Sequence, residues 1–362
     1  MDNLTHVALD VHKEQTAVAV LRPGDHEPDQ RVIASTPEAY RKLVSRVGTD
    51  GVVVCYEAGP CGYDPHRVFT ALGVRCEVIA PSLIPRRSGD RVKTDRLDAR
   101  NLARLHRAGE LTTIRVPSEV EEAVRDLVRV REDIREDRRV AIVRTKAFLL
   151  RRGIHASKGW NIHHTEWARG LRFTQPAAQE AFDALVGALQ TRDVQLRSLD
   201  EKIGEWSLRE PLAQPVARLR ALRGIDTLSA ATLAAEVCDF RAFGSAPSFM
   251  AFTGLVPSEH SSGARTRRGA ITKSGNAHIR RILVEAAWSY RHHPAVGVQL
   301  RRRQQDQPQV VITHSWVAQH RLHSKYHRVA ACHGPNVATV AVARELAGFI
   351  WALMTEHYAT EG

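Results

Sequence analysis

The stretch THVALDVHKEQTAVAVL, residues 5–21, decides how the N-terminal part of the chain folds. Its two apolar runs, residues 5–11 and 15–21, are rich in Val and Ala and are separated by the polar triplet HKE. Short apolar runs joined by a few polar residues are typical of two antiparallel strands with a tight turn. The first run also contains Asp10, a carboxylate with apolar neighbours, which is costly to bury unless it is paired or binds a metal ion.

Strands and helices alternate after this stretch. RVIAS at 31–35 predicts a third strand, and a helix follows from Pro37 to about Val47. The β-branched run GVVVCYEAG at 51–59 predicts a strand covered on both faces, with Glu57 near its carboxyl end. A helix in GYDPHRVFTALG, a strand in RCEVIAP and a helix in DRLDARNLARLHRAG come next. This order predicts a mixed sheet with helices on both sides, the layout of the ribonuclease H type fold.

The composition changes after residue 117. EVEEAVRDLVRVREDIREDRRVAIVRTKAFLLRRG is highly charged and predicts a long helix with coiled-coil character, because apolar residues recur every seventh position at Val120, Leu127, Ile134, Ala141 and Phe148. A second helical stretch from Gln175 to about Leu208 predicts a helical hairpin, with GWNIHHTEWARG as a loop at its end. We therefore predict three domains: a sheet domain at 1–117, a helical coiled-coil linker at 118–210 and a mainly helical domain at 211–362.

Charge and composition narrow the class of partner. The 362 residues include 52 Lys and Arg against 40 Asp and Glu, a net charge of +12 that favours a polyanion such as nucleic acid. No apolar run approaches the length needed to cross a bilayer, and the first residues do not resemble a signal peptide, so we expect a cytoplasmic protein without a membrane partner. The five cysteines lack paired CxxC spacing and predict small buried residues in a reducing compartment.

Four carboxylates form the first candidate site. Asp10 and Glu57 lie on predicted strands, whereas Asp95 and Asp98 are three residues apart on a predicted helix and share one of its faces. Converging oxygens suit two divalent cations that clamp the attacking and leaving oxygens in phosphodiester cleavage, and such ligands select Mg²⁺ or Mn²⁺. Each acid also has a plainer interpretation, as a helix cap, an ion-pair partner or a solvated helix face. Only the set of four in this order points to metal.

The segment GLVPSEHSSGARTRRGAITKSGNAHIRR, residues 254–281, is the second candidate site. It combines Ser258, Ser261 and Ser262 with basic residues and with glycines at 254, 263, 269 and 275. Such a loop can bring its backbone close to a phosphate while cations neutralise the charge. On composition alone, phosphate binding without covalent chemistry outweighs a serine nucleophile. The predicted nucleic-acid contacts are Arg265, Arg267, Arg268, Lys273, Arg280 and Gly224.

Gly224 is included because it precedes a small-residue helix, the pattern of a helix-hairpin-helix whose turn amides bind the DNA backbone. Ordinary packing of an Ala-rich helix explains the same residues equally well.

Taken together, these motifs resemble the DEDD-type transposases of the insertion-sequence one-hundred-ten family, the bridge-RNA-guided recombinases. LDVHK around Asp10, YEAG around Glu57 and KTDRLDARNLA around Asp95 and Asp98 look like that family's RuvC-like domain. The segment GLVPSEHSSGARTRRGAITKSGNAHIRRILVEAAW looks like its C-terminal transposase domain, so the resemblance spans nearly the whole chain.

The resemblance implies a mechanism that the residues alone do not give. Ser262, the serine before Gly263, would be the nucleophile that joins covalently to cleaved DNA, with Ser261 as the adjacent alternative. The four acids would hold magnesium. A noncoding RNA would pair with target and donor DNA, and protomers would assemble as dimers and then tetramers so that the two domain types meet across chains.

Three functions follow from these observations. The first is a transposase that cuts and rejoins DNA through a covalent serine intermediate. The second is a RuvC-like, metal-dependent, structure-selective nuclease in which water attacks and the serine segment only grips phosphate. The third is a noncatalytic nucleic-acid-binding protein whose acids are structural.

Overall fold

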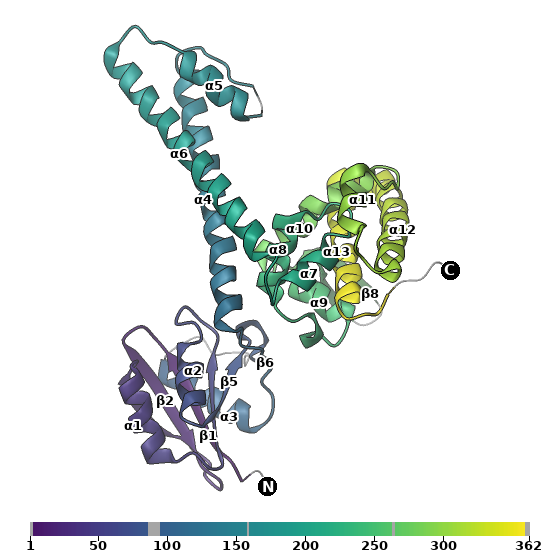
Figure 1. The fold of residues 1–362 in the computed structure, drawn as a ribbon. Coiled ribbons are helices and arrows are strands. Elements are labelled where there is room, and N and C mark those ends of the chain that lie inside the picture. Colours follow the sequence, from purple (N-terminus) through teal and green to yellow (C-terminus); the bar gives the residue numbers. More distant parts are fainter. Residues whose placement is uncertain (1–2, 86–94, 158, 263–264, 359–362) are drawn as a thin grey trace. The chain divides into compact units, whose positions relative to one another are not determined.

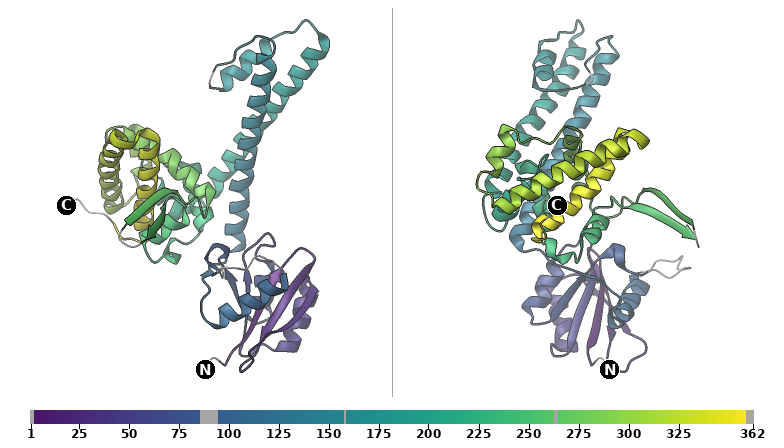
Figure 2. Two further views of the ribbon diagram at one scale, coloured as in Figure 1. Left: turned by 180° about the vertical axis from the view of Figure 1, so that it is seen from behind. Right: turned by 90° about the vertical axis from the view of Figure 1, so that its right-hand side faces the viewer.

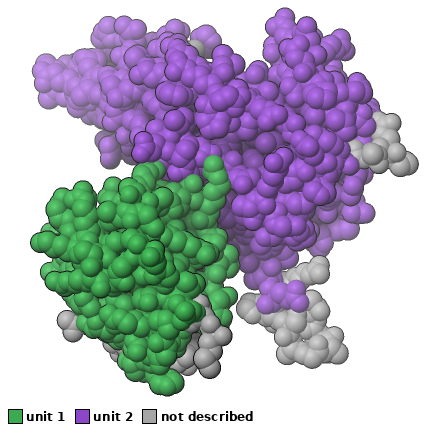
Figure 3. Space-filling view, turned by 60° about the horizontal axis from the view of Figure 1, so that its bottom comes forward, with its two compact units in different colours: residues 1–116 green, residues 117–362 purple. Residues whose placement is uncertain are grey.

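The computed structural model describes residues 3–85, 95–157, 159–262 and 265–358, and at 82, 95–97, 162, 260–262 and 265–268 it describes the backbone only. The chain divides into two compact units, residues 1–116 and 117–362, which are coloured separately in Figure 3. The helices of the predicted linker belong to the second unit, and the division into three domains stays a prediction.

A six-stranded mixed sheet forms the centre of the first unit, with the strand order β3-β2-β1-β4-β5-β6 (Figure 1). β1, β4 and β5 run parallel, while the other neighbouring pairs are antiparallel. The last strand was not predicted, because two residues are too short to show a period. The strands are β1 (Thr5–Val11), β2 (Gln15–Leu21), β3 (Asp29–Ala34), β4 (Val52–Glu57), β5 (Arg75–Ile79) and β6 (Thr113–Ile114).

Helices cover both faces of this sheet. On one face, α1 (Pro37–Val47) and α2 (Asp64–Ala71) bury Tyr40 and Phe69 against side chains of the central strands. On the other face, α3 (Asp95–Arg107) buries Ala99 and Ala103. Each large apolar side chain buried in this way stabilises the fold by roughly 1.5–3 kcal/mol. The predicted mixed sheet with helices on both sides is therefore confirmed, and its layout is consistent with a RuvC-like domain.

The cysteines only partly match the prediction of buried small residues. Cys55 and Cys76 are buried in the first unit, and burial raises the pKa of Cys76 to about 12. Cys332 is exposed on α12 (Gln309–His333), so the prediction is wrong for this residue. Cys332 lies on the solvent side of this helix. Its apolar neighbours in the sequence do not show which side of the helix it occupies.

An antiparallel helical hairpin opens the second unit. It consists of α4 (Glu119–Leu150) and α6 (Pro176–Trp206), as predicted. A capping box at Ser118 and Glu121 begins α4 and satisfies backbone amides that no helical carbonyl can reach. The seventh-residue repeat is not uniformly buried, since Val120 is exposed whereas Phe148 is buried. Ion pairs between α4 and α6 therefore supply part of the stabilisation that a continuous apolar interface would provide.

The end of the hairpin is not the loop that the sequence suggested. Residues 162–170 form helix α5 (Ile162–Gly170), which packs against α6. Its polar composition hid the helix, but Asn161 caps it by accepting a hydrogen bond from the backbone N–H of His164. Figures 1 and 2 show α5 beside the ends of α4 and α6.

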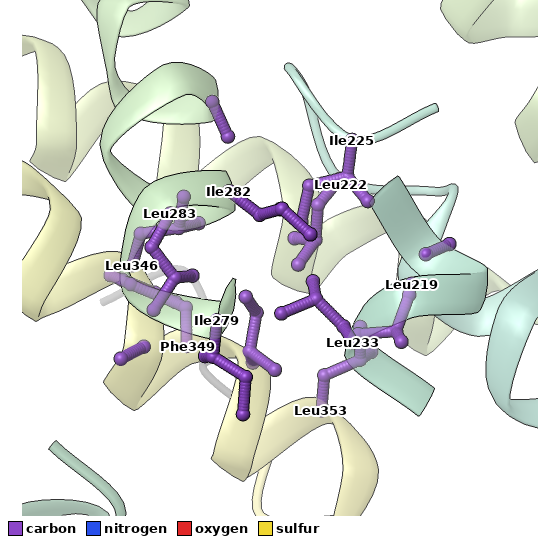
Figure 4. Packing of buried hydrophobic residues seen from close by; sticks show 14 of the residues in the cluster. Leu219, Leu222, Ile225, Leu233, Ile279, Ile282, Leu283, Leu346, Phe349 and Leu353 are labelled. Atoms are coloured by element: carbon purple, nitrogen blue, oxygen red, sulfur yellow. The ribbon is translucent and has the colours of Figure 1, made fainter. Parts of the chain in front are cut away.

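Helices and one β-hairpin make up the rest of the second unit. Their apolar side chains meet in a single core, in which Leu222, Leu233, Ile279, Leu283 and Leu346 lie together (Figure 4). The elements not yet given are α7 (Ala213–Leu219), α8 (Thr227–Val237), α9 (Ala246–Phe252), β7 (Pro257–Ser262), β8 (Arg265–Ile271), α10 (Ala277–Ala287), α11 (Val298–Gln304) and α13 (Pro335–Met354), with short 3₁₀ turns at Pro81–Leu83, Phe240–Ala242 and Trp288–Arg291.

Helix α13 corrects the prediction that no apolar run approaches membrane-spanning length. Its 20 residues are long and apolar enough to cross a bilayer by length and composition. In the structure, however, Val342, Leu346 and Ile350 are fully buried in the core of the second unit. Its apolar character is explained by this packing.

Candidate functional site

Asp10 and Glu57 come from neighbouring parallel strands. β1 and β4 are paired so that Leu9 stands opposite Tyr56, and the next residue along each strand is one of the two acids. Parallel strands present their carboxyl ends at the same edge of a sheet. The ladder therefore brings these two residues side by side.

Both acids belong to the sheet face that α3 covers. Successive side chains of a strand point to opposite faces, so Asp10 lies on the same face as Ala8, and Glu57 on the same face as Cys55. Ala8 and Cys55 pack in one buried cluster with Ala99 of α3. The small side chains at these positions let the helix lie close to the sheet.

The direction of α3 is fixed at its C-terminal end. His106 Nδ1 lies 2.9 Å from His6 Nδ1, and His106 Nε2 lies 3.0 Å from Glu77 Oε2. The end of α3 thus lies beside the beginning of β1, and the helix runs back along that strand toward Asp10. From His106 to Asp98 the helix rises about 12 Å, and from His6 to Asp10 the strand rises about 13 Å, so the two aspartates reach the same level.

We call Asp10, Glu57 and Asp98 the acidic edge. The side chain of Asp10 is 22% exposed and its Oδ2 lies 3.2 Å from Nε2 of His12. Glu57 is exposed and Asp98 is half-buried. Asp95 begins α3 one turn before Asp98, but its side chain lies outside the described part of the structure.

The donor chemistry of the acidic edge fits a hard divalent cation, because every predicted ligand offers carboxylate oxygen. Among the side chains that the structure describes, no group of three acids, histidines or cysteines is close enough to enclose an ion. The described residues alone therefore do not surround an ion.

His12 is a neighbour of this edge that the sequence reasoning missed. Its ring contacts Asp10 although the residue was assigned to a turn. The signal was present in LDVHK, where one residue, Val11, separates His12 from Asp10 at the end of a strand. Alternation alone places both side chains on one side of the chain.

The segment around Ser262 is a β-hairpin, not the predicted loop. β7 and β8 form a two-stranded antiparallel sheet in which Ser262 pairs with Arg265 and Ser261 with Thr266. We call residues 257–271 the serine hairpin; Figure 2 shows it extending from the helices of the second unit. The clustering of Ser, Gly and Arg obscured the strands, because these residues are common in loops. The side chains of Ser261, Ser262, Arg265, Arg267 and Arg268 lie outside the described part of the structure.

Two of the glycines in this segment serve the protein backbone rather than a ligand. A Cβ atom at Gly254 would lie 2.0 Å from the carbonyl oxygen of Ser274, and one at Gly275 would lie 2.1 Å from that of Phe252. Both residues have positive φ. The base of the serine hairpin can close only because these positions lack side chains, and their role in close approach to phosphate stays a prediction.

The remaining predicted contacts have structural partners as well. Gly224, between α7 and α8, has a φ of +82°, and a Cβ there would lie 2.6 Å from the carbonyl oxygen of Ala286. Arg280 donates to the carbonyl oxygen of Thr253 at 3.1 Å and so braces the same base. Lys273 lies two residues after the end of β8, where its side chain is exposed and its backbone N–H donates to the carbonyl oxygen of Gly254 at 3.1 Å. Their role in binding nucleic acid stays a prediction.

Glu236 is a buried acid that the sequence reasoning did not single out. Arg129 of α4 donates to its two oxygens at 2.8 and 2.9 Å, and Asn276 Nδ2 donates at 2.7 Å. Burial by itself raises the pKa of Glu236, but the bonds from Arg129 and Asn276 outweigh it and hold the pKa below its ordinary value. This carboxylate therefore links helix α4 of the helical hairpin to the segment that follows β8. An acid inside the apolar run LAAEV was its only signal.

Comparisons with known proteins identify the family. Residues 7–152 match a DEDD transposase family model, and residues 216–300 match the model described as "Transposase IS116/IS110/IS902 family". The chain is 40% identical over 358 residues to the protein of Sinorhizobium fredii named "Putative transposase y4qE", covering 97% of this chain and 88% of that protein. It is 33% identical over 336 residues to the transposase for insertion sequence element IS1533 of Leptospira borgpetersenii, covering 90% of this chain and 96% of that protein.

The two family matches fall on different parts of the chain. The DEDD match contains the acidic edge, and the second match contains the serine hairpin. A DEDD-type family indicates dependence on a divalent metal ion, and a transposase implies DNA as the partner. The chain therefore belongs to the IS110 family of transposases, enzymes that cut and recombine DNA for the mobility of insertion sequences.

Proposed function

We propose that this transposase cuts and rejoins DNA through a covalent bond to Ser262, with Asp10, Glu57, Asp95 and Asp98 holding Mg²⁺. The observation that supports the metal site is that Asp10, Glu57 and Asp98 belong to one face and one level of the first unit. A divalent ion bound there would neutralise charge that develops on the attacking and leaving oxygens.

The proposal for the serine rests on its place in the chain. Ser262 is the last residue of β7, and the strand that returns beside it carries Arg265, Arg267 and Arg268. Cations on the neighbouring strand would neutralise the phosphate under attack. The serine oxygen bonds to phosphorus, one phosphorus–oxygen bond of the DNA backbone breaks, and the released DNA oxygen takes up a proton. Reversal with a different DNA hydroxyl rejoins the strands.

The finer parts of the proposal concern partners. A noncoding RNA of the element would pair with target and donor DNA and so supply sequence recognition, which leaves the protein to bind shape and backbone. The protein would act as a dimer or tetramer in the bacterial cytoplasm. Arg265, Arg267, Arg268, Lys273, Arg280 and Gly224 are the proposed nucleic-acid contacts.

Trapping the covalent intermediate tests the serine. The protein is incubated with the element's noncoding RNA, Mg²⁺ and end-labelled target and donor DNA, and the mixture is denatured and separated on a gel. Wild-type protein and Ser261→Ala should retain labelled DNA, whereas Ser262→Ala should retain none. An adduct at the wild-type level in Ser262→Ala would overturn the assignment of the nucleophile.

The same assay separates the recombinase from the nuclease. Asp10→Asn should lose strand cleavage, because one carboxylate of the acidic edge is replaced by an amide. Cleavage by Ser262→Ala that leaves a free phosphate end with no attached protein would favour the nuclease, in which water attacks. Cleavage that persists in Asp10→Asn would contradict the metal assignment.

A further inference from the structure

The end of the helical hairpin is a small folded module with its own core. We call residues 144–186 the hairpin tip. Phe148 of α4, Phe182 of α6 and Ala168 of α5 are buried together there. The guanidinium of Arg152 lies 3.6 Å from the centre of the Phe148 ring, an orientation that cation–π attraction stabilises. The tip therefore has apolar packing of its own in addition to the ion pairs along the hairpin.

The charges of the tip differ from those of the shaft, residues 119–143 and 187–206. The shaft contains 9 Lys and Arg against 12 Asp and Glu, whereas the tip contains 7 against 3. Shaft arginines are neutralised within the hairpin, as in the ion pairs Arg131–Asp200, Arg138–Asp193 and Arg192–Asp137. In the described part of the tip, no carboxylate lies within 4.0 Å of the cationic groups of Arg151, Arg152, Arg169 and Arg172.

Two of these arginines line a groove. Arg169 and Arg172 line a hollow of about 360 Å³ together with Gln179 and Asp183 of α6. Arg172 Nη1 donates to the carbonyl oxygen of Arg169 at 2.7 Å, which holds the two residues at one rim. Asp183 is the acid of this groove, and the amide of Gln179 donates to it at 2.8 Å. The cations at the rim exceed the single carboxylate.

We propose that the hairpin tip binds the phosphate backbone of duplex DNA through Arg151, Arg169 and Arg172. Exposed cations that the protein does not neutralise itself are the usual contacts for phosphates, and they read no sequence. Proteins that bind single strands combine cations with a series of aromatic stacking platforms. Trp167 is the exposed aromatic residue in the described part of the tip, and one ring does not make such a series.

The length of α4 sets where this contact falls. Arg129 is bonded to Glu236, which is bonded in turn to Asn276 at the base of the serine hairpin. From Arg129 to Arg151 the helix rises about 33 Å, which is close to one turn of DNA, about ten base pairs. The tip therefore contacts DNA about ten base pairs from the region bound at the base of the serine hairpin.

The salt dependence of DNA binding tests the inference. Affinity is measured by fluorescence anisotropy over a range of NaCl concentrations, with generic duplexes of about 15 and about 35 base pairs, shorter and longer than the spacing requires. For wild type, the plot of log affinity against log salt should be steeper with the longer duplex. The variant Arg151→Gln/Arg169→Gln/Arg172→Gln should lose about two to three units of that slope on the longer duplex, about 0.9 per phosphate contact.

The matched control is Arg41→Gln/Arg139→Gln/Arg197→Gln, which removes the same charge from exposed positions on α1 and the shaft. It should keep the wild-type slope. The variant Arg151→Lys/Arg169→Lys/Arg172→Lys should also keep the wild-type slope. That result would show that the positive charge of the tip determines the slope. Equal slopes for tip variant and control, or a loss seen only with an RNA duplex, would overturn the proposal.

The inference needs DNA as substrate but not the serine chemistry. If the covalent adduct fails to form while the tip variant loses its slope, the proposed function is wrong and the tip contact stands. If the tip variant instead changes only the sedimentation of the free protein, the tip is a contact between copies and the DNA proposal is overturned.

Discussion

Glu236 is a carboxylate with a side chain that is 1% exposed, and its charge is balanced by Arg129. Removing one partner of a buried ion pair leaves the other charge desolvated, which costs about 3–5 kcal/mol in a fully buried pair. Because the Arg129 side chain is 46% exposed, water can replace part of its contact. We expect Arg129→Ala to lower the free energy of unfolding of the second unit by about 2 kcal/mol, measured by urea denaturation.

Arg139→Ala is the control, since Arg139 lies on the same helix and pairs with Glu136 at the surface. It should leave the free energy of unfolding unchanged. The effect of Arg129→Ala should also depend on pH. The pKa of Glu236 in the folded protein is below its ordinary value of 4.5, so this carboxylate stabilises the fold above that pH and the contribution is lost as the pH falls through the folded pKa. A pH-independent difference between variant and wild type would contradict this account.

At the scale of elements, the acidic edge depends on how α3 lies over β1. The contacts of His106 with His6 and Glu77 hold the end of the helix that is remote from Asp98. We expect His106→Ala to weaken the binding of Mn²⁺ roughly threefold to tenfold, because the positions of ligands depend on the contacts behind them. The measurement is a Mn²⁺ titration followed by electron paramagnetic resonance.

His163→Ala, on the exposed surface of α5, is the matched control and should bind Mn²⁺ as wild type does. An unchanged affinity in His106→Ala would show that α3 is held in place without this contact. Circular dichroism of both variants separates a shifted helix from an unfolded unit.

The sequence predicted the elements with a clear period and missed those without one. Alternation and β-branched runs gave the five longer strands of the first unit, whereas the strand pairing that places Asp10 beside Glu57 came from the structure. The serine hairpin and α5 were interpreted as loops, since their polar residues hide the period of each element. The contacts of Arg129 and Glu236 depend on which elements pack together, which no local pattern contains.

At the scale of the whole molecule, each unit has its own core. The first unit buries apolar side chains on both faces of its sheet, and the second buries a separate cluster among its helices. The acidic edge and the serine hairpin belong to different units. Each unit can therefore be tested separately for its proposed part in the chemistry.

We expect residues 1–116 to fold alone and to bind the metal ion. A fragment of this size can bury a core sufficient for stability, and its sheet is complete within the unit. The fragment should melt cooperatively in circular dichroism, and Mn²⁺ at about 100 times its dissociation constant should stabilise it by about 2.7 kcal/mol. Asp10→Asn in the same fragment should keep the cooperative melt and lose most of the stabilisation. A fragment that fails to melt cooperatively would show that the sheet needs the second unit, whereas stabilisation that survives in Asp10→Asn would place the bound metal away from the acidic edge.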